Sequence, residues 1–490
     1  SFSRAHRRAP LRVLPMPDVS LLDELPPEYP GDLERHVRDA VATSSRKVVA
    51  LDDDPTGVQT VHDTAVLARW SVADLVAELK RPNPVFFILT NSRSLPTSEA
   101  VALNAEIVGN LAAASRETGI GFAVASRSDS TLRGHFPAET DAIATAIGGM
   151  DGVLLCPAFF EGGRYTIDDI HYVRDGDRLI PAAETEFARD ATFGYAHSNL
   201  REWVEEKTGG QVRADDVVSL PLAEIRTGGP DRIAELLLAV EGGRPVVVNA
   251  ASYADLSVVA LGLLRAEAAG KRFVYRTGAS FVRARVGMPA RPLLTRAELL
   301  GANAPPYLPG LIVVGSHVRR SGEQLARLLE LPRTAGIEVG VPELLESEAA
   351  REREVERALR EAETALRSGV TPVIYTSRKV EIAIGGDQLA VSRTVSAALV
   401  TIAGGVEGRP GFVVGKGGIT SSDVGTQALG ARRVVVLGQI RPGVPVWRLG
   451  PETRFPELPY VVFPGNVGGP ETLAEVVAEL RGGQARSGVT

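Results

Sequence analysis

Short apolar runs alternate with stretches of helical periodicity along nearly the whole chain. The runs 48–51, 85–89, 121–125 and 152–156 have the length and composition of buried strands, whereas 99–117 has apolar residues at three- and four-residue spacing. Strands that are apolar throughout are buried on both faces, which is typical of parallel strands covered by helices. The alternation therefore predicts an α/β fold with mostly parallel sheets.

The alternation is interrupted by the segment 287–310, which holds several prolines and no strong strand, and it restarts at residue 311. A chain of 490 residues is also too long for one ordinary core. We therefore predict two α/β domains joined by a linker. The predicted boundaries are an N-terminal tail and lead-in over 1–45, a first domain over 46–286, the linker over 287–310 and a second domain over 311–490.

Composition excludes several classes of protein. The formal net charge of -6 argues against sequence-independent binding to nucleic acid, which needs a basic surface. The single cysteine, Cys156, excludes a disulfide framework within the chain and a cysteine zinc site, and we interpret it as a buried thiol at a strand end. No apolar run approaches the roughly 18 residues of a membrane span. We expect a cytoplasmic protein, without a membrane or nucleic-acid partner, whose arginine-rich first 15 residues form a disordered tail.

Three consecutive acids follow the first apolar run, in the segment Asp52-Asp53-Asp54-Pro55-Thr56-Gly57. In parallel α/β sheets, ligands bind beyond the carboxyl ends of the strands. An acid placed there can accept a proton from a substrate hydroxyl or hold Mg²⁺. Asp and Thr are also common helix caps, so a loop that only caps helices is the alternative interpretation.

Further polar clusters follow other predicted strands of the first domain. After the run 121–125 come Asp129, Ser130 and Arg133, and Arg93 follows the run 85–89 in the same way. A guanidinium pairs with a carboxylate through two parallel hydrogen bonds, so these residues suit an acidic substrate. The turn Gly163-Arg164 follows Cys156 and permits close approach of the backbone to a ligand. A solvated loop with internal Asp–Arg pairs is the alternative.

Glycine-rich turns follow predicted strands of the second domain. One lies at Gly315-Ser316, one at Gly417-Gly418-Ile419-Thr420 and one at Gly465. Backbone amides at such turns bind phosphate, although none of the three matches the G-x-x-x-x-G-K-[ST] loop. The chain also lacks H-E-x-x-H, G-x-S-x-G and a G-x-G-x-x-G after the first strand, which disfavours a zinc hydrolase, an α/β-hydrolase and a dinucleotide-dependent dehydrogenase.

Together these segments resemble the four-carbon acid sugar kinase family, whose members are ATP-dependent kinases of threonate, erythronate and 3-oxo-tetronate. The resemblance extends from about Lys47 to Val477. It is carried in chain order by Asp53-Asp54-Pro55-Thr56-Gly57, Asp129-Ser130-Thr131-Leu132-Arg133-Gly134, Pro157-Ala158-Phe159 with Gly163-Arg164, Gly417-Gly418-Ile419-Thr420-Ser421, the run from Gln439 to Pro445, and Gly465-Asn466-Val467-Gly468.

The resemblance implies a sugar acid in the first domain, ATP in the second and an active site in the cleft between them. By that likeness Asp53, Asp54, Arg93, Asp129, Ser130, Arg133, Gly163 and Arg164 belong to the acid site, and Ser316, Gly417, Gly418, Ile419, Thr420 and Gly465 hold the nucleotide. The implied reaction is transfer of the γ-phosphoryl group of Mg-ATP to the C4 hydroxyl. The Mg²⁺ ligands are not implied, and a homo-oligomer is possible.

Four residues depart from the family pattern. Pro55 stands where an aromatic residue is common, and Asp52 adds a third acid; we expect both to affect substrate choice. Ile419 stands where a glutamate is frequent and Pro464 where a serine is frequent; we expect these to affect nucleotide contacts.

The hypothesis assigns a role to each group. Arg133 and Arg93 clamp the substrate carboxylate, Asp54 or else Asp53 accepts the hydroxyl proton, and glycine-turn amides grip the phosphates with Lys416 as an extra charge. Because the two sites lie on different domains, closure is expected to bring them together. Two alternatives stay open: a metal-dependent sugar-acid isomerase or aldolase that uses the acid cluster, and a sugar-acid sensor that consumes no ATP.

Overall fold

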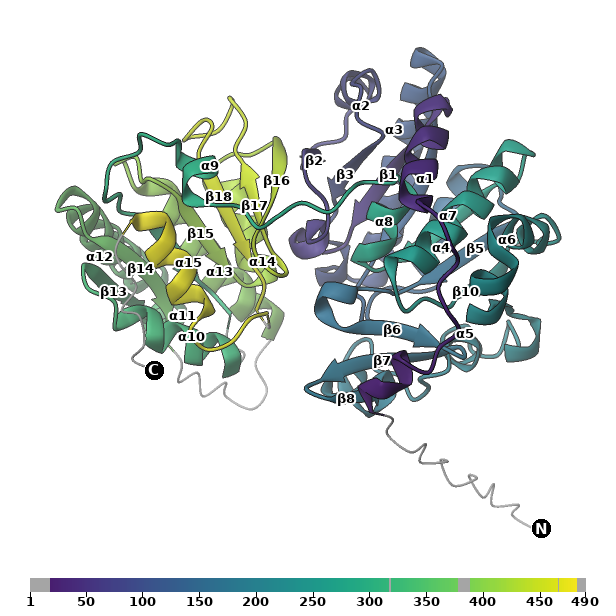
Figure 1. The fold of residues 1–490 in the computed structure, drawn as a ribbon. Coiled ribbons are helices and arrows are strands. Elements are labelled where there is room, and N and C mark those ends of the chain that lie inside the picture. Colours follow the sequence, from purple (N-terminus) through teal and green to yellow (C-terminus); the bar gives the residue numbers. More distant parts are fainter. Residues whose placement is uncertain (1–17, 317–318, 378–387, 466, 483–490) are drawn as a thin grey trace, which may run out of the picture.

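The structure is a computed structural model that describes residues 18–316, 319–377, 388–465 and 467–482. It consists of two α/β halves that lie side by side (Figure 1). The tail predicted over the first 15 residues lies outside the described residues. Within the described ranges, no helix combines the length and the apolar composition needed to cross a bilayer.

The first half contains a parallel sheet in the order β2-β3-β1-β4-β11-β5-β10-β9. Every strand predicted here from an apolar run is present, and Cys156 is buried at the end of its strand, as predicted. The strands are β1 (Arg46–Asp52), β2 (Thr64–Leu67), β3 (Val85–Leu89), β4 (Gly121–Arg127), β5 (Gly152–Cys156), β9 (Val218–Leu220), β10 (Arg244–Val248) and β11 (Phe273–Thr277).

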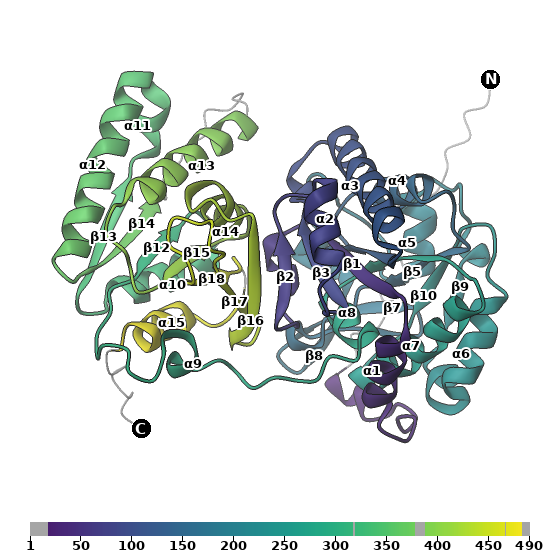
Figure 2. The same cartoon turned by 90° about the horizontal axis from the view of Figure 1, so that it is seen from above.

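Helices cover both faces of this sheet (Figure 2). The predicted helix over 99–117 is α3, which buries Ile107, Val108 and Leu111 on one face and ends where Gly119 adopts a left-handed conformation. Within the predicted lead-in, α1 places Val37 in the core beside α7. The helices are α1 (Leu33–Thr43), α2 (Val72–Leu79), α3 (Thr97–Thr118), α4 (Ala138–Ala146), α5 (Leu200–Lys207), α6 (Gly229–Leu238), α7 (Tyr253–Ala268) and α8 (Ala279–Arg285).

A small antiparallel sheet follows the turn at Gly163 and was not predicted. Its strands are β6 (Arg164–Ile167), β7 (Ile170–Asp175) and β8 (Arg178–Pro181). The hairpin between β6 and β7 turns at Asp168 and Asp169, both with positive φ, which is the backbone that a two-residue hairpin loop requires. Strands this short and mixed in polarity give no apolar run to detect.

The second half contains a sheet in the order β13-β14-β12-β15-β18-β17-β16. Strand β17 is antiparallel to both of its neighbours, β16 and β18, and the remaining neighbours in this sheet are parallel. The strands are β12 (Leu311–Val314), β13 (Thr334–Val339), β14 (Thr371–Thr376), β15 (Val413–Lys416), β16 (Arg433–Arg441), β17 (Val444–Arg448) and β18 (Pro459–Phe463). The helices are α10 (Arg319–Leu329), α11 (Val341–Glu346), α12 (Glu348–Arg367), α13 (Gln388–Gly405), α14 (Gly418–Asp423) and α15 (Thr472–Arg481).

The two halves share one continuous sheet. Strand β16 of the second half pairs in antiparallel register with β2 of the first, which joins all fifteen strands (Figure 2). Beside this pairing, Arg433 Nε lies 2.8 Å from Oε2 of Glu78, a carboxylate on α2 that is almost fully buried. The halves are thus held together by a backbone ladder and a shielded ion pair.

The chain crosses between the halves through the segment predicted as a linker. Figure 2 shows this connection extended along one side of the molecule. It ends in the short helix α9 (Arg296–Leu300), where Thr295 and Glu298 form a reciprocal capping box. Arg296 Nε donates to the carbonyl of Leu480, at the end of α15, which fixes this end of the connection to the second half.

Removing the Glu78 carboxylate should destabilise the joint. The Glu78→Ala variant removes a buried carboxylate that pairs with both Arg433 and Arg81, so we expect the free energy of unfolding in urea to fall by on the order of 2 kcal/mol. Glu356→Ala is the control, because Glu356 pairs with Arg360 at the surface. That pair should contribute at most about 0.5 kcal/mol. Equal stability of the two variants would contradict the importance of the buried pair.

Candidate active site

The carboxyl ends of neighbouring strands bring the predicted acid-site residues of the first half together. In the sheet register Asp52 lies opposite Leu89 on β3 and opposite Arg127 on β4, and Arg127 in turn lies opposite Thr277 on β11. The loops that follow β1, β3 and β4 therefore leave the sheet at one rim, which is where parallel α/β sheets bind ligands.

Asp53 is held by arginines. Its carboxylate accepts two hydrogen bonds from Arg93, from Nε at 3.1 Å and from Nη2 at 2.6 Å. Arg127 Nη1 lies 3.7 Å from the same carboxylate. Asp53 is 4% exposed. Both oxygens of Asp53 are thus engaged, and the guanidinium of Arg93 is occupied by a protein carboxylate.

Asp54 is held differently. Its Oδ1 accepts hydrogen bonds from the backbone N–H of Thr56 at 2.9 Å and from the Thr56 hydroxyl at 2.6 Å, as the cap of the turn Pro55–Val58. Its Oδ2 lies 3.8 Å from Arg93 Nη1 and beside Gly418 of the second half. The Thr-Gly sequence after the acids therefore fixes one oxygen of Asp54 and leaves the other directed toward the glycine turn.

Asp52, the third acid, is buried and lies beneath the other two. It is fully excluded from solvent, neither carboxyl oxygen has a hydrogen-bond partner among the described residues, and Arg127 Nη1 lies 3.6 Å away. Burial raises the pKa of Asp52 to about 8, against a partly opposing effect of Arg127. The carboxyl group fills the space over Gly57, where a Cβ would lie 2.0 Å from Oδ1, so glycine is required there.

Asp129 and Arg133 form a second ion pair at this rim. Arg133 Nε lies 2.6 Å from Asp129 Oδ2, and Arg133 Nη1 lies 3.7 Å from Asp190. Although burial opposes it, the charges of Arg133 and Arg93 hold the pKa of Asp129 well below its usual range. Between the two, the backbone carbonyl of Ser130 accepts a hydrogen bond from His171. The internal Asp–Arg pairing expected for a solvated loop is therefore present, and its members are partly buried.

Gly163 and Arg164 lie at the start of the small sheet. Gly163 has a φ of 73°, and its carbonyl accepts the amide of Arg174 across the hairpin. The guanidinium of Arg164 lies 5.9 Å from the ring centroid of Phe159 and 6.0 Å from that of Phe187. Phe187 also contacts Arg133 at 5.2 Å, so this ring brings Arg164 into the neighbourhood of the Asp129–Arg133 pair.

The predicted nucleotide residues of the second half also converge. Strands β12, β15 and β18 are neighbours, and Val314, Lys416 and Phe463 lie in register at their carboxyl ends. Gly417 has a φ of 111° and donates its amide to the carbonyl of Phe463. A Cβ on Gly417 would lie 3.0 Å from Ser316, and the hydroxyl of Ser321 reaches both Ser316 and the carbonyl of Gly465.

Two members of this turn differ sharply in exposure. Thr420 is 8% exposed and packs against Gly315, where a Cβ would lie 2.2 Å from its hydroxyl. Ile419, the residue that departs from the family pattern, is 54% exposed. An apolar side chain of this size at the surface of a glycine turn offers a hydrophobic contact rather than a charge.

Lys416 does not reach the surface of the turn. Its side chain is fully buried, and the ammonium donates to the carbonyls of Pro464 at 2.6 Å and Gly465 at 3.1 Å while lying 4.5 Å from the ring centroid of Phe463. The sequence suggested an extra charge that grips phosphates. In the structure this charge instead fixes the neighbouring turn.

The two groups of residues meet at the boundary between the halves. A Cβ on Gly418 would lie 2.6 Å from Asp54 Oδ2, and the side-chain amide of Asn91 donates to the hydroxyl of Ser422. The sequence suggested that a closing motion is needed to unite the two sites. The residues Asp53, Asp54, Arg93, Asp129 and Arg133 are called the acid rim below, and residues 417–420 are called the glycine turn. In this structure the acid rim and the glycine turn already adjoin.

Several rim residues were missed by the sequence analysis. Arg276, on β11, donates to the carbonyl of Arg133, and Glu139 on α4 accepts from Asn104, with its pKa raised to about 7 by burial. Phe187 lies in the short 3-10 helix Glu186–Arg189 that follows β8, and Asp190 is the C-cap of that helix. Arg127 lies within the polar cluster that follows the run 121–125, so the sequence could have indicated it. The other residues reach the rim only through tertiary contacts, which leave no local signal in the sequence.

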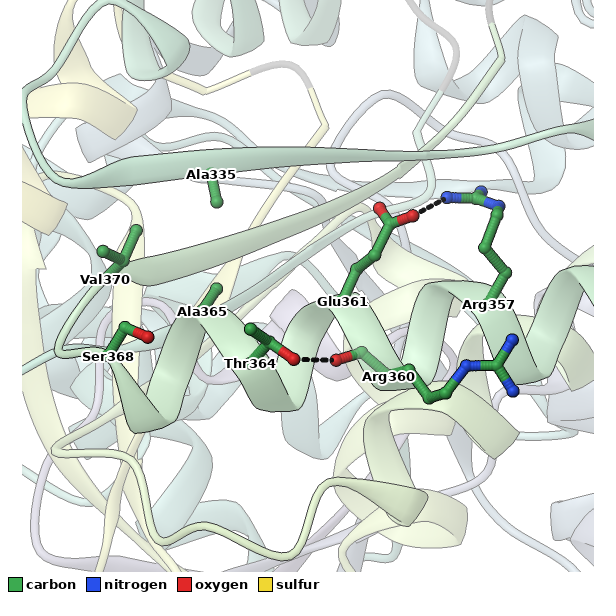
Figure 3. A pocket seen from close by; sticks show the side chains of 8 residues that line it. All are labelled: Ala335, Arg357, Arg360, Glu361, Thr364, Ala365, Ser368 and Val370. Carbon is green, nitrogen blue, oxygen red and sulfur yellow. Dashed lines mark hydrogen bonds and ion pairs between the residues drawn. The ribbon is translucent and has the colours of Figure 1, made fainter.

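A surface hollow lies away from this rim, at the outer edge of the second half. It has a volume of about 470 Å³ and lies between α12, β13 and the start of β14 (Figure 3). Its two arginines are paired with carboxylates: Arg357 lies 2.8 Å from Glu361, and Arg360 lies 3.5 Å from Glu356. None of the residues predicted to bind a ligand lines this hollow.

Asp52 should make the protein less stable as the pH rises. The folded carboxyl retains its proton up to about pH 8, whereas an unfolded chain releases it near pH 4, so stability falls across that interval. The Asp52→Asn variant removes this titration. We expect the unfolding temperature of Asp52→Asn minus that of wild type, both measured by calorimetry, to increase from pH 5 to pH 8. Asp39→Asn, at an exposed ion pair, is the control with no such trend. A pH-independent difference for Asp52→Asn would contradict the assignment.

Two family descriptions match consecutive parts of the chain. A sugar-binding N-terminal domain matches residues 48–285, and a nucleotide-binding C-terminal domain matches residues 311–473. The first range contains the acid rim and the second contains the glycine turns.

Characterised relatives match most of the chain. A 3-oxo-tetronate kinase of Cupriavidus necator is 28% identical over 81% of this chain and 86% of its own length. A second 3-oxo-tetronate kinase, from Pseudomonas savastanoi pv. phaseolicola, is 29% identical over 87% and 92%. A D-threonate kinase of Bordetella bronchiseptica is 28% identical over 88% and 96%.

Solved structures share the fold. A Salmonella typhimurium LT2 protein matches with a TM-score of 0.64 at 20% identity, over 88% of this chain and 98% of its own. Haemophilus influenzae protein HI1011 matches with a TM-score of 0.58 at 20% identity over the same shares. Because consecutive ranges match a sugar-binding N-terminal domain and a nucleotide-binding C-terminal domain, and because kinases of four-carbon sugar acids are its relatives over most of their length, this chain belongs to the four-carbon acid sugar kinase family.

Proposed function

We propose that this protein transfers the γ-phosphoryl group of ATP to the C4 hydroxyl of a four-carbon sugar acid such as threonate, erythronate or 3-oxo-tetronate. The observation that carries the proposal is the contact between Asp54 of the acid rim and Gly418 of the glycine turn. Phosphoryl transfer is mainly a matter of positioning and charge stabilisation, so the acceptor site and the phosphate site must adjoin.

Asp54 is the better candidate for the base that accepts the hydroxyl proton. One oxygen is fixed by Thr56, and the other is directed toward the second half. Asp53 has both oxygens occupied by Arg93 and is nearly buried, so it suits a positioning role. A base needs an oxygen within hydrogen-bond reach of the acceptor hydroxyl, and Asp54 alone keeps one beside the phosphate turn.

The nucleotide side consists of backbone rather than side-chain charge. Gly417, Gly418, Thr420 and Gly465 surround the carboxyl ends of β15 and β18, and Ser316 borders them from β12. Amides in a turn with a positive-φ glycine create a concave site for phosphate oxygens. Ile419 offers an exposed apolar contact beside this turn for the remainder of the nucleotide.

Mg²⁺ belongs to the proposal as the counter-ion of ATP. Within the described part of the chain, no three metal-ligating side chains converge, and the rim carboxylates mostly contact arginines. Mg²⁺ is commonly held by substrate phosphates and water with few protein ligands. We therefore assign it no protein ligand here.

The test of the function is an ATP-consumption screen over the stereoisomers of four-carbon sugar acids and their 3-oxo forms. Activity on at least one acid supports the proposal. A folded protein that binds these acids but consumes no ATP with any of them would favour the sensor. A protein that converts one without ATP would favour the isomerase or aldolase.

Asp54→Asn should abolish turnover while nucleotide binding stays nearly intact. The amide cannot accept the hydroxyl proton, and loss of a general base lowers kcat by roughly 10²- to 10⁴-fold. The kcat for the best acid and the Kd for ATP by calorimetry are the measurements. Asp39→Asn, at an exposed ion pair, is the matched control and should keep wild-type kcat. Near-normal kcat in Asp54→Asn would show that the base assignment is wrong.

Gly418→Ala should separate the two sites. The added Cβ would lie 2.6 Å from Asp54 Oδ2, so one side of the boundary must move. We expect kcat to fall by on the order of tenfold or more, because small misplacements at a reacting centre are costly. Binding of the sugar acid alone should change little. Gly322→Ala is the control, because its Cβ would meet no atom within 4 Å. Equal kcat values for both variants would contradict the proposed contact.

A further inference from the structure

The rim of the first half contains five guanidiniums, and they differ in what they contact. Three of them lie within ion-pair distance of a carboxylate, namely Arg93, Arg127 and Arg133. The other two, Arg164 and Arg276, have no carboxylate partner of this kind among the described residues. A buried or half-buried guanidinium without a counter-charge is costly, so each of the two needs an explanation.

Arg276 is explained by the protein itself. It is 4% exposed, its guanidinium lies 5.5 Å from the ring centroid of Phe136 and 5.2 Å from that of Trp203, and its Nη2 donates to the carbonyl of Arg133. It is enclosed by aromatic faces that favour a cation. Such a group stabilises the loop of Arg133 and leaves little surface for a ligand.

Arg164 is only partly satisfied. It is half-buried, and its Nη1 donates to the carbonyl of Gly162 within its own turn. Its Nε is buried and has no hydrogen-bond partner in the described structure. Nη2 also lacks a protein acceptor there, so the Nε–Nη2 edge, which can bind a carboxylate through two hydrogen bonds, is unused.

The surroundings of Arg164 favour an additional anion. Burial lowers the pKa of Arg164, and the like charge of Arg133 adds to this, against a partial compensation by Asp129. Phe159 and Phe187 contact the guanidinium at about 6 Å and supply no formal charge. A carboxylate bound at the free edge would supply the missing counter-charge and be partly shielded from water, which strengthens the interaction.

We propose that Arg164 is the residue that binds the C1 carboxylate of the substrate and sets the preference for sugar acids over neutral polyols. This inference rests on the proposed function and changes one assignment within it. The sequence suggested Arg93 and Arg133 as the carboxylate clamp. Both are paired with protein carboxylates, so they position Asp53 and Asp129 around the substrate, and Arg164 recognises the acid.

Arg164→Met tests the proposal, because methionine retains an apolar side chain near Phe159 and Phe187 and removes the charge. The probes are threonate and threitol, the corresponding acid and neutral polyol, each used as phosphoryl acceptor and each titrated calorimetrically. We expect the preference for threonate over threitol in kcat/KM to fall roughly 10- to 100-fold, the effect of losing hydrogen bonds to a charged group. The Kd for threonate should rise by a similar factor, while the Kd for ATP stays unchanged.

Two further variants separate recognition from folding. Arg164→Lys should recover part of the preference, because lysine keeps the charge but lacks the two-point fork. Arg189→Met, on the exposed face of the neighbouring loop, should behave as wild type. A threonate Kd within twofold of wild type in Arg164→Met, or equal losses with threonate and threitol, would overturn this inference alone. A wild type that binds no four-carbon acid would overturn the proposed function and the inference with it.

Discussion

The pairing of β2 with β16 is the constraint on which the rest of the site depends. Four residue pairs along this ladder place the second half against the first, and the shielded contact between Glu78 and Arg433 lies beside them. Because the ladder has a fixed register, a one-residue slip would reverse which side chains face the core. The register therefore determines which residue of the glycine turn meets Asp54. The active site is built by sheet geometry across the boundary rather than by loops alone.

Charge compensation organises the acid rim. Asp53 with Arg93 and Asp129 with Arg133 form short pairs, so most of the charge in this region is balanced before any ligand binds. Asp52 is a further carboxyl group, fully buried, and burial raises its pKa. A balanced network holds its members in place with little freedom, which suits groups that must orient a small substrate. Arg164, whose Nε has no hydrogen-bond partner among the described residues, is the member that we propose selects the ligand.

The sequence predicted the strands of the parallel core and most of the rim acids, because both leave local signals. An apolar run that ends in Asp52 or Ser126 marks a strand and its functional end together. The order of the strands leaves no such signal. The insertion of β11 between β4 and β5 brings Arg276 to the rim, and the pairing of β2 with β16 merges two expected sheets into one. The direction of side chains also leaves no signal in the sequence. The residues near Lys416, for example, do not indicate that its side chain is buried. The domain limits, the roles of the site residues, the oligomeric state and the cytoplasmic location stay predictions.

The inward turn of Lys416 also affects the opposite side of its neighbouring loop. Its ammonium attracts the carbonyl oxygens of Pro464 and Gly465. In a planar trans peptide the N–H is directed opposite to the C=O, so the amide of Gly465 is directed away from the lysine. A cation on one side of a backbone segment can thereby orient the N–H donors toward the other side of that segment. Such donors favour an anion that does not contact the cation. In this protein a buried lysine next to a glycine-rich turn thus orients the peptide that joins Pro464 to Gly465.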